Sequence, residues 1–367
     1  MTFQRMPVTG PWKGIISDVP PPGDPTMFDD ALNFLMTKGR LATRPKLTNF
    51  LYTDGPLLGA ASFQDAVNNF HTLFLTINKA EFLTTGPLTL NPLINTGTFP
   101  GVSGYQTGRP YGMAELINQV YFCNGSSLVT YVDGSNSTYD AGDVPGSCLF
   151  LEVDGTGSHL IGANWFEPQP GVSGATSFPR RVRWTDSGNP LEWIAAPSNS
   201  AGLNDLEECP DSITGMATLG RNTYIYRTDG ITVMYPTGVG NAPFAFEDLS
   251  KSNAGIGSVF PYALAKYDSN CIAISFNDVY LNSNGTQVPI AGGKVKKRIF
   301  ADLAANSGGF VTGAILPSLG PAVDFLAYYL NIPGPNVTWV YSFDDENWTR
   351  INSSLGCFTQ IASLLVA

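Results

Sequence analysis

The chain has 367 residues, of which 43% are hydrophobic, enough to form a large core and to exclude a disordered chain. Charged residues make up only 14%, whereas there are 39 glycines and 27 prolines, a composition typical of many short strands joined by turns rather than of long surface helices. The formal net charge is −10, with 30 acidic and 20 basic side chains, which argues against a protein that binds nucleic acid tightly through its phosphates.

Cysteine usage and hydropathy restrict the chain further. Residues 1–22 contain no apolar stretch of signal-peptide length, and no run of about 18 apolar residues occurs. We therefore expect synthesis in a cytoplasm and no membrane insertion. The five cysteines lack Cys-x-x-Cys spacing, so neither a disulfide framework nor a zinc site is supported, and most are expected to be small core residues: Cys123, Cys148, Cys209, Cys271 and Cys357.

The first part of the chain differs from the rest. Residues 1–45 are rich in proline and glycine, as in 20–25, and are predicted to form an extended arm that lies on a neighbouring molecule, with one short helix near Met27 to Met36. Residues 46–367 are predicted to form one domain. Within it, from about Phe50, apolar and polar residues alternate with the period of two that is typical of strands.

Groups of such strands recur about 40 to 65 residues apart, close to the length of a four-stranded propeller blade. Turns between the strands of a group are marked by Asn-Gly and Asp-Gly pairs, because these residues tolerate the positive φ of tight hairpins. The pattern predicts an all-β fold, a β-propeller of about six blades with seven as the alternative count, and a pair of β-sandwiches as the competing fold. The apolar segment 358–366 is expected to pair near Phe50 and close the ring. The six groups cover residues 71–84, 116–134, 148–193, 213–235, 262–285 and 325–351.

Few residues suggest chemistry. His71 and His159 both lie inside apolar strand patterns and are interpreted as structural. No His-x-Glu, His-x-x-x-His, Gly-x-Ser-x-Gly or Gly-x-x-x-x-Gly-Lys-Ser/Thr spacing is found, so metal hydrolysis, serine-type acyl transfer and nucleotide binding are unsupported. A calcium loop over 133–143 does not match the EF-hand spacing and is better explained as a solvated turn. We expect no cofactor and no metal.

Two acidic clusters keep a glycoside hydrolase open as an alternative, because two carboxylates could meet across the central channel of a propeller. Two basic clusters, at 180–183 and 294–298, alternate with apolar residues, which suggests cross-strand or intersubunit ion pairs as readily as a solvated face. The acidic residues are Asp205, Glu207 and Glu208, followed by Asp211, and then Asp344, Asp345 and Glu346.

The segment 181–193 is the most informative of the chain and is predicted to form a strand, a tight turn and a second strand that ends in tryptophan. It reads Arg-Trp-Thr-Asp-Ser-Gly-Asn-Pro-Leu-Glu-Trp over 183–193. It has only a loose similarity to the Asp-box turn of sialidases, from which the Asp and Trp spacings depart. The residues expected to hold this hairpin together are Arg183, Trp184, Asp186, Gly188, Pro190 and Trp193.

The same segment resembles the Arg-Trp-Ser/Thr-Asp-x-Gly-x-Pro-x-x-Trp pattern of propeller-type nozzle or hub proteins of short-tailed bacteriophages, also called packaged-DNA stabilisation proteins. The pieces 31–45, 211–235 and 255–285 resemble successive parts of the same family, including an Asn segment before Gly39-Arg40 and an Arg44-Pro45 pair. Lys46 stands where a glycine usually follows that pair. The resemblance thus extends over most of the chain.

The resemblance implies a structural virion protein of the phage tail and not an enzyme. It implies a homo-hexameric ring below the portal and adaptor, which continues the DNA channel and docks tail fibres or a needle. The acidic residues Asp205, Glu207, Glu208, Asp344, Asp345 and Glu346 would then be candidates for the channel wall, along which DNA passes without tight binding. A propeller that binds host glycans through exposed aromatics such as Trp165 or Trp348 is the alternative, together with the glycoside hydrolase.

Overall fold

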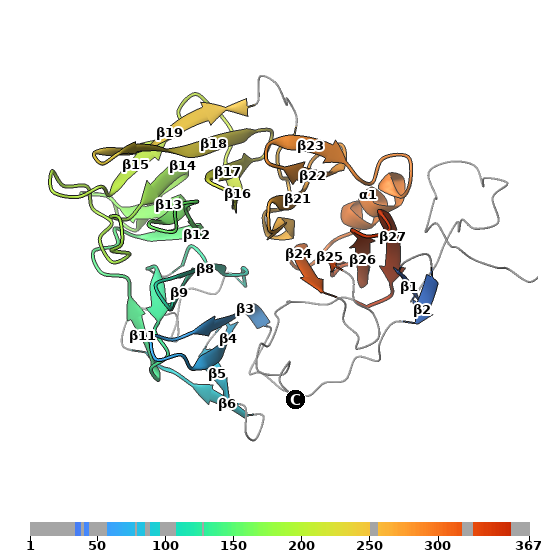
Figure 1. Cartoon of the computed structure of the whole chain (residues 1–367), viewed down its shortest axis with the longest axis horizontal. Coiled ribbons are helices and arrows are strands. Elements are labelled where there is room, and N and C mark those ends of the chain that lie inside the picture. The colour runs from blue at the N-terminus through green and yellow to red at the C-terminus, as the bar shows by residue number, and fades with distance from the viewer. Residues whose placement is uncertain are drawn as a thin grey trace, which may run out of the picture.

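In the computed structural model the chain folds as a six-bladed β-propeller, in which six antiparallel sheets follow one another around a central axis in chain order (Figure 1). The structure describes residues 34–37, 40–43, 57–77, 79–84, 89–95, 108–126, 128–249, 256–317 and 326–353. The six sheets confirm the predicted all-β propeller and, over these residues, the count of six blades. Among the described residues, no helix is long and apolar enough to cross a membrane.

Each blade is a meander of four strands, because short runs of β-branched and aromatic residues alternate with turn residues. The first three blades are β3 (Leu57–Gln64), β4 (Phe70–Thr76), β5 (Ala80–Thr84) and β6 (Thr89–Pro92); β8 (Gly112–Leu116), β9 (Gln119–Cys123), β10 (Thr130–Val132) and β11 (Ser137–Asp140), extended by the parallel pairing of β7 (Ile94–Asn95) with β11; and β12 (Ser147–Val153), β13 (Leu160–Pro168), β14 (Ala175–Trp184) and β15 (Gly202–Asp205).

The other three blades follow the same order. They are β16 (Ile213–Leu219), β17 (Asn222–Arg227), β18 (Ile231–Val239) and β19 (Ala242–Asp248); β20 (Ala265–Tyr267), β21 (Asn270–Ile274), β22 (Val279–Ser283) and β23 (Thr286–Pro289); and β24 (Thr312–Pro317), β25 (Leu326–Ile332), β26 (Val337–Ser342) and β27 (Asn347–Ile351). In each blade the first strand lies nearest the central axis and the fourth lies at the outside (Figure 1). A 3-10 turn, η2 (Pro261–Ala263), precedes β20.

The hydrophobic core is divided into clusters that lie between consecutive blades. One cluster joins blades 1 and 2, and further clusters join blades 2 and 3, 3 and 4, 4 and 5, and 5 and 6. Two smaller clusters belong to blade 1 alone and to blade 6 alone. Because side chains of successive strand residues point to opposite faces, each sheet of blades 2 to 5 supplies one face to the cluster before it and the other to the cluster after it.

The part of the chain before the propeller differs from the prediction. Residues expected to end a short helix instead form β1 (Phe34–Thr37), which pairs antiparallel with β2 (Arg40–Thr43). The strand β1 lies beside β26 and β27 of the same chain. Residues 27–33, the rest of the predicted arm and the predicted closing strand at 358–366 lie outside the described residues.

A helix that was not predicted, α1 (Lys296–Ala304), connects β23 to β24. The basic residues 294–298 were expected to alternate along a strand, but they occupy the turn before α1 and its first three positions. The helix forms because Ile299 and Leu303, four positions apart, bury one face in the cluster between blades 5 and 6. Lys294 donates to the carbonyl of Glu346, and Lys296 lies 3.7 Å from Asp278.

Candidate functional site

The segment 181–193, which carries the resemblance, begins as the end of β14. The second strand predicted for this hairpin is not formed. After Trp184 the chain makes a loop in which Asp186 and Asn189 form an isolated bridge, and the partner strand of β14 is β15, which begins only at Gly202. The loop departs from a hairpin because Trp193 is drawn into the core between blades 2 and 3, where it is fully buried.

Two arginines of β14 form a charged network with carboxylates of the neighbouring strands. Arg183 donates from Nε and Nη2 to the two oxygens of Glu167, at 2.7 and 2.8 Å. Arg181 donates to Glu167 at 2.8 Å and, with Nε and Nη2, to both oxygens of Asp205 at 2.8 and 2.7 Å. Hydrogen bonds with Asp205 raise the pKa of Arg181, and those with Arg181 lower the pKa of Asp205. The ion pairs expected of this basic cluster are therefore cross-strand pairs within one chain.

The two tryptophans that bound the segment are buried in different cores. Trp184 donates from Nε1 to the carbonyl of Ser200 at 2.8 Å, and its ring lies where a side chain at Gly202 would stand. Trp193 packs edge-on against Trp165, with ring centroids 5.3 Å apart. The backbone N–H of Trp193 donates to Asp143, which precedes blade 3. The segment thus connects the cores on both sides of blade 3.

The turn residues of the segment also have structural roles. Asp186 accepts hydrogen bonds from the backbone N–H and the hydroxyl of Ser200, at 2.8 and 2.7 Å, and these hydrogen bonds lower its pKa. Gly188 has φ of +72°, which a side chain would strain, and its N–H donates to the carbonyl of Ser158 at 2.8 Å. Pro190 is buried. All six residues predicted to hold this segment together therefore lie in the end of β14 and the loop that follows it, and the strand ends at Trp184.

A serine, a histidine and two aspartates meet beside this turn, a grouping that the sequence did not indicate. Nε2 of His159 lies 3.4 Å from the hydroxyl of Ser200, and Nδ1 lies 3.7 Å from Asp154. This is not the geometry of a catalytic triad, because the Ser200 hydroxyl donates to Asp186 and Nδ1 of His159 has no hydrogen-bond partner. Burial opposes ionisation of Asp154, but interactions with His159 and hydrogen bonds from the turn at 156–159 outweigh it and hold its pKa below the usual range.

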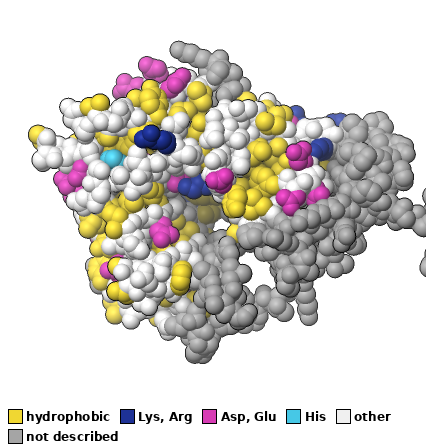
Figure 2. Space-filling model, viewed as in Figure 1, with side chains coloured by type: hydrophobic (Ala, Val, Ile, Leu, Met, Phe, Trp, Pro, Cys, Tyr) yellow, Lys and Arg dark blue, Asp and Glu magenta, His cyan; other side chains and the backbone are white. Residues whose placement is uncertain are grey.

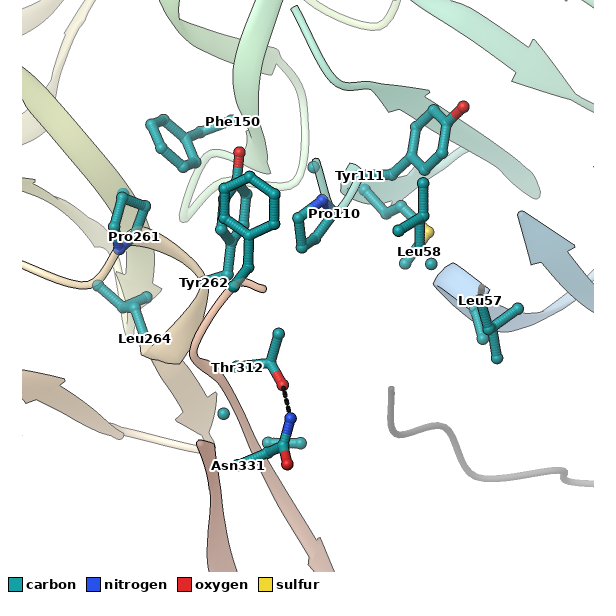
Figure 3. Close-up of a pocket in the computed structure, with 18 of the residues that line it drawn as sticks. Leu57, Leu58, Pro110, Tyr111, Phe150, Pro261, Tyr262, Leu264, Thr312 and Asn331 are labelled. Carbon is teal, nitrogen blue, oxygen red and sulfur yellow. Dashed lines mark hydrogen bonds between the residues drawn. The ribbon is translucent and has the colours of Figure 1, made fainter. Parts of the chain in front are cut away.

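The central cavity of the propeller has a volume of about 540 Å³ and is lined by residues of the first strands of five blades, by the η2 turn before blade 5 and by adjoining loops. Figure 3 shows Leu58, Tyr111, Phe150 and Tyr262 around this space, together with a hydrogen bond of 3.2 Å from Asn331 to Thr312. None of the described residues that line it is charged. The carboxylate pair that a glycoside hydrolase would need is therefore not provided by the acidic clusters, which lie elsewhere.

The acidic residues named from the sequence lie in different blades and do not line the central cavity. Asp205 is on the outermost strand of blade 3 and is bound by Arg181, whereas Glu207 and Glu208 follow it and are exposed. Residues 344–346 form the turn between β26 and β27 of blade 6. Figure 2 shows acidic side chains at several separate places on one face of the molecule rather than in one patch.

Three further expectations can be compared with the structure. Trp165 and Trp348, proposed as exposed glycan-binding aromatics, are fully buried, because each completes a core between two blades. Four cysteines are buried, as expected, and Cys357 lies outside the described residues. No group of three or more His, Cys, Asp or Glu side chains that could hold a metal ion is found in the described part of the chain.

The chain was also compared with known proteins. No family model matches it, and a search of curated proteins finds no match. Similar solved structures include a quinonprotein alcohol dehydrogenase-like protein from Bacteroides thetaiotaomicron, with 12% identity and a TM-score of 0.39, covering 79% of this chain and 65% of that chain. Another is dihydro-heme d1 dehydrogenase NirN in complex with DHE, with 12% identity and a TM-score of 0.41, covering 86% and 57%.

A third similar structure is puromycin hydrolase, with 9% identity and a TM-score of 0.44, covering 82% of this chain and 45% of that chain. This chain spans less than two thirds of the length of each of these three proteins. At such identities the likeness concerns the fold alone, and the propeller is established by the six sheets of the chain itself.

Proposed function

We propose that this chain is a structural tail protein of a short-tailed bacteriophage, of the nozzle or hub type, which assembles as a homo-hexameric ring below the portal and adaptor. The observation that carries the proposal is the place of the resembling segments in the fold. They lie in chain order in three successive blades, at 182–193 in blade 3, 211–235 in blade 4 and 255–285 around blade 5.

The side chains of these segments support a structural role. Trp193 and Trp184 lie in the cores on the two sides of blade 3, and Arg183 joins two strands within that blade. In blade 4, Arg227 is buried and donates to Asp211 and Asp248, both at 2.6 Å, which joins β17 to the residues before β16 and to the end of β19. In the next segment, Gly257 has no room for a side chain, since a Cβ there would lie 2.2 Å from the carbonyl oxygen of Arg227.

The charge of the chain is compatible with a ring around DNA. A net charge of −10 would repel the phosphates and let the genome pass without binding. Blades 3 and 6 lie on opposite sides of the propeller (Figure 1), so in the proposed ring we expect Glu207 and Glu208 to face a different part of the assembly from residues 344–346. In this proposal one of the two groups faces the channel. Asp205 contributes less negative charge to the channel wall, because Arg181 neutralises it.

The mass of the assembly tests this function. Light scattering and native mass spectrometry of the purified chain, alone and mixed with the portal and adaptor of its virion, should give six times the 39.3 kDa of one chain, alone or on the adaptor. A second experiment reverses the charges of Glu207 and Glu208 in one variant and of Asp344 and Glu346 in another. Only the variant whose reversed residues face the channel should retain DNA. A chain that stays monomeric and binds neither partner would contradict the proposal and would direct attention to glycan binding.

A further inference from the structure

We propose that Cys123 and Cys148 are a site of covalent cross-linking, at which oxidation by a peroxide joins blade 2 to blade 3 through a disulfide. The two sulfur atoms lie 3.2 Å apart, although the residues belong to different blades and are 25 positions apart in the sequence. A disulfide needs the sulfurs to be about 2 Å apart, so they have to approach by little more than about 1 Å. This inference is independent of the function proposed above.

The backbone brings these residues together by a close approach of two inner strands. Cys123 ends β9 and is paired across the sheet with Gly112 of β8. At Gly112 the strand β12 of the next blade passes so close that a Cβ would lie 2.6 Å from the carbonyl oxygen of Leu149. Only a glycine leaves room for this approach, and Leu149 directly follows Cys148. The position of the second thiol beside the first is thus fixed by main-chain packing.

Both thiols lie in the core between blades 2 and 3 and are fully buried. Cys148 has room because its neighbour Gly162 lacks a side chain, since a Cβ there would lie 3.1 Å from the Cys148 sulfur. The other members of this core are apolar or aromatic, among them Trp165 and Trp193. A disulfide is less polar than two thiols and leaves no hydrogen-bond donor to satisfy, so this core would accept it.

The reaction balances with hydrogen peroxide as the oxidant. One thiolate attacks a peroxide oxygen, the O–O bond breaks, and a sulfenic acid and one water are formed once the thiol proton is counted. The sulfur of the second cysteine then attacks the sulfenic sulfur, the S–S bond forms, the S–O bond breaks, and a second water leaves. Two thiols and one peroxide give one disulfide and two waters. Burial and the neighbouring Cys123 raise the pKa of Cys148, so the reaction should be slow.

The test uses the purified full-length chain and hydrogen peroxide. Non-reducing peptide mapping should give one cross-linked pair of peptides containing Cys123 and Cys148, and the intact mass should fall by about 2 Da. The melting temperature should rise by about 3 to 5 °C, because the cross-link restricts the unfolded chain, and dithiothreitol should reverse the rise. The buried Cys209, in the core between blades 3 and 4, supplies a matched control, since Cys209→Ala should leave the cross-link intact.

The variant Cys148→Ala, in which Cys123 has no second cysteine beside it, serves as the control for whether the oxidant reaches the site. The peroxide dose and temperature are raised until Cys123 of this variant is oxidised to the sulfenic or sulfinic acid, which shows that peroxide reaches the site. The wild-type chain is then treated in the same way. If its two cysteines are recovered as separate oxidised or unmodified residues, with no cross-linked peptide, the proposal is overturned.

Discussion

Arg183 donates to both carboxylate oxygens of Glu167, and the same carboxylate accepts a third hydrogen bond from Arg181. Glu167 is 4% exposed, so it is the buried anion that compensates two cations of β14. Its removal would leave Arg183 partly buried without its carboxylate partner and Arg181 with Asp205 alone, which is costlier than the loss of an exposed ion pair.

We therefore expect Glu167→Ala to lower the free energy of unfolding by about 3 kcal/mol. The exposed Glu207 provides a matched control, because Glu207→Ala should change the free energy of unfolding by less than about 0.5 kcal/mol. Urea unfolding followed by tryptophan fluorescence measures both variants. Equal stability of the two variants would show that the network does not hold blade 3.

Trp193 is fully buried against Trp165 although it belongs to a loop rather than to a strand. Trp193→Ala should lower the free energy of unfolding by about 3 to 5 kcal/mol, since it removes a large side chain from a packed core. Ile194, the next residue, is 52% exposed, and Ile194→Ala should have almost no effect. A Trp193→Ala variant as stable as the wild type, but defective in a binding or catalytic activity, would contradict the structural assignment.

The grouping of Ser200 with His159 gives a test of the enzyme alternative. Ser200→Ala removes a hydroxyl that donates to Asp186, accepts from the N–H of Ser187 and lies 3.4 Å from Nε2 of His159, and should cost about 1 to 2 kcal/mol of stability. Ser187→Ala, at an exposed position, is the control. Wild type and Ser200→Ala should release p-nitrophenol from p-nitrophenyl acetate at the same background rate. Loss of a measurable wild-type rate in Ser200→Ala would instead identify Ser200 as a nucleophile.

Asp65 makes stability depend on acid pH. A hydrogen bond from His71, at 2.9 Å, lowers the pKa of Asp65 from 3.8 to about 2, assisted by the N–H groups of Val67 and Asn69. Because the folded pKa lies below the unfolded value, this stabilisation is present above about pH 4 and is lost as the pH falls towards 2.

The melting temperature measured between pH 5 and 2 should therefore fall more steeply for the wild type than for Asp65→Asn, which cannot titrate at this position. Glu208→Gln removes an exposed carboxylate and should keep the wild-type slope. Parallel curves for the wild type and Asp65→Asn would show that Asp65 ionises equally in the folded and unfolded chains.

Much of the fold could be predicted from local patterns. The turn at Asn284-Gly285, for example, has φ values of +47° and +94° and joins β22 to β23, as its sequence indicates. Within the predicted group 116–134, however, the turn between β8 and β9 lies at Ile117 and Asn118, with φ of +52° and +59°, where the sequence has none of the Asn-Gly or Asp-Gly pairs that mark other turns. An isoleucine rarely adopts this conformation, so propensity could not reveal that turn.

Contacts between blades could not be predicted from the sequence for a related reason. The pairing of Cys123 with Cys148 and the helix α1 both depend on contacts between blades, and the period of two within a strand carries no information about which residues of the next blade it meets. Burial of Trp193 likewise follows from a loop that crosses to a neighbouring core. Residue spacing predicted the blades but not the contacts between them.

The location of the cores between blades has a consequence for the newly synthesised chain. From the second blade on, each blade leaves the ribosome with one face covered by its predecessor, and every blade before the last has a face that stays apolar and open until the next sheet is made. A ribosome that pauses after any of blades 1 to 5 would therefore hold an intermediate with an exposed apolar sheet face. A chain truncated between blades should aggregate rather than form a smaller soluble propeller.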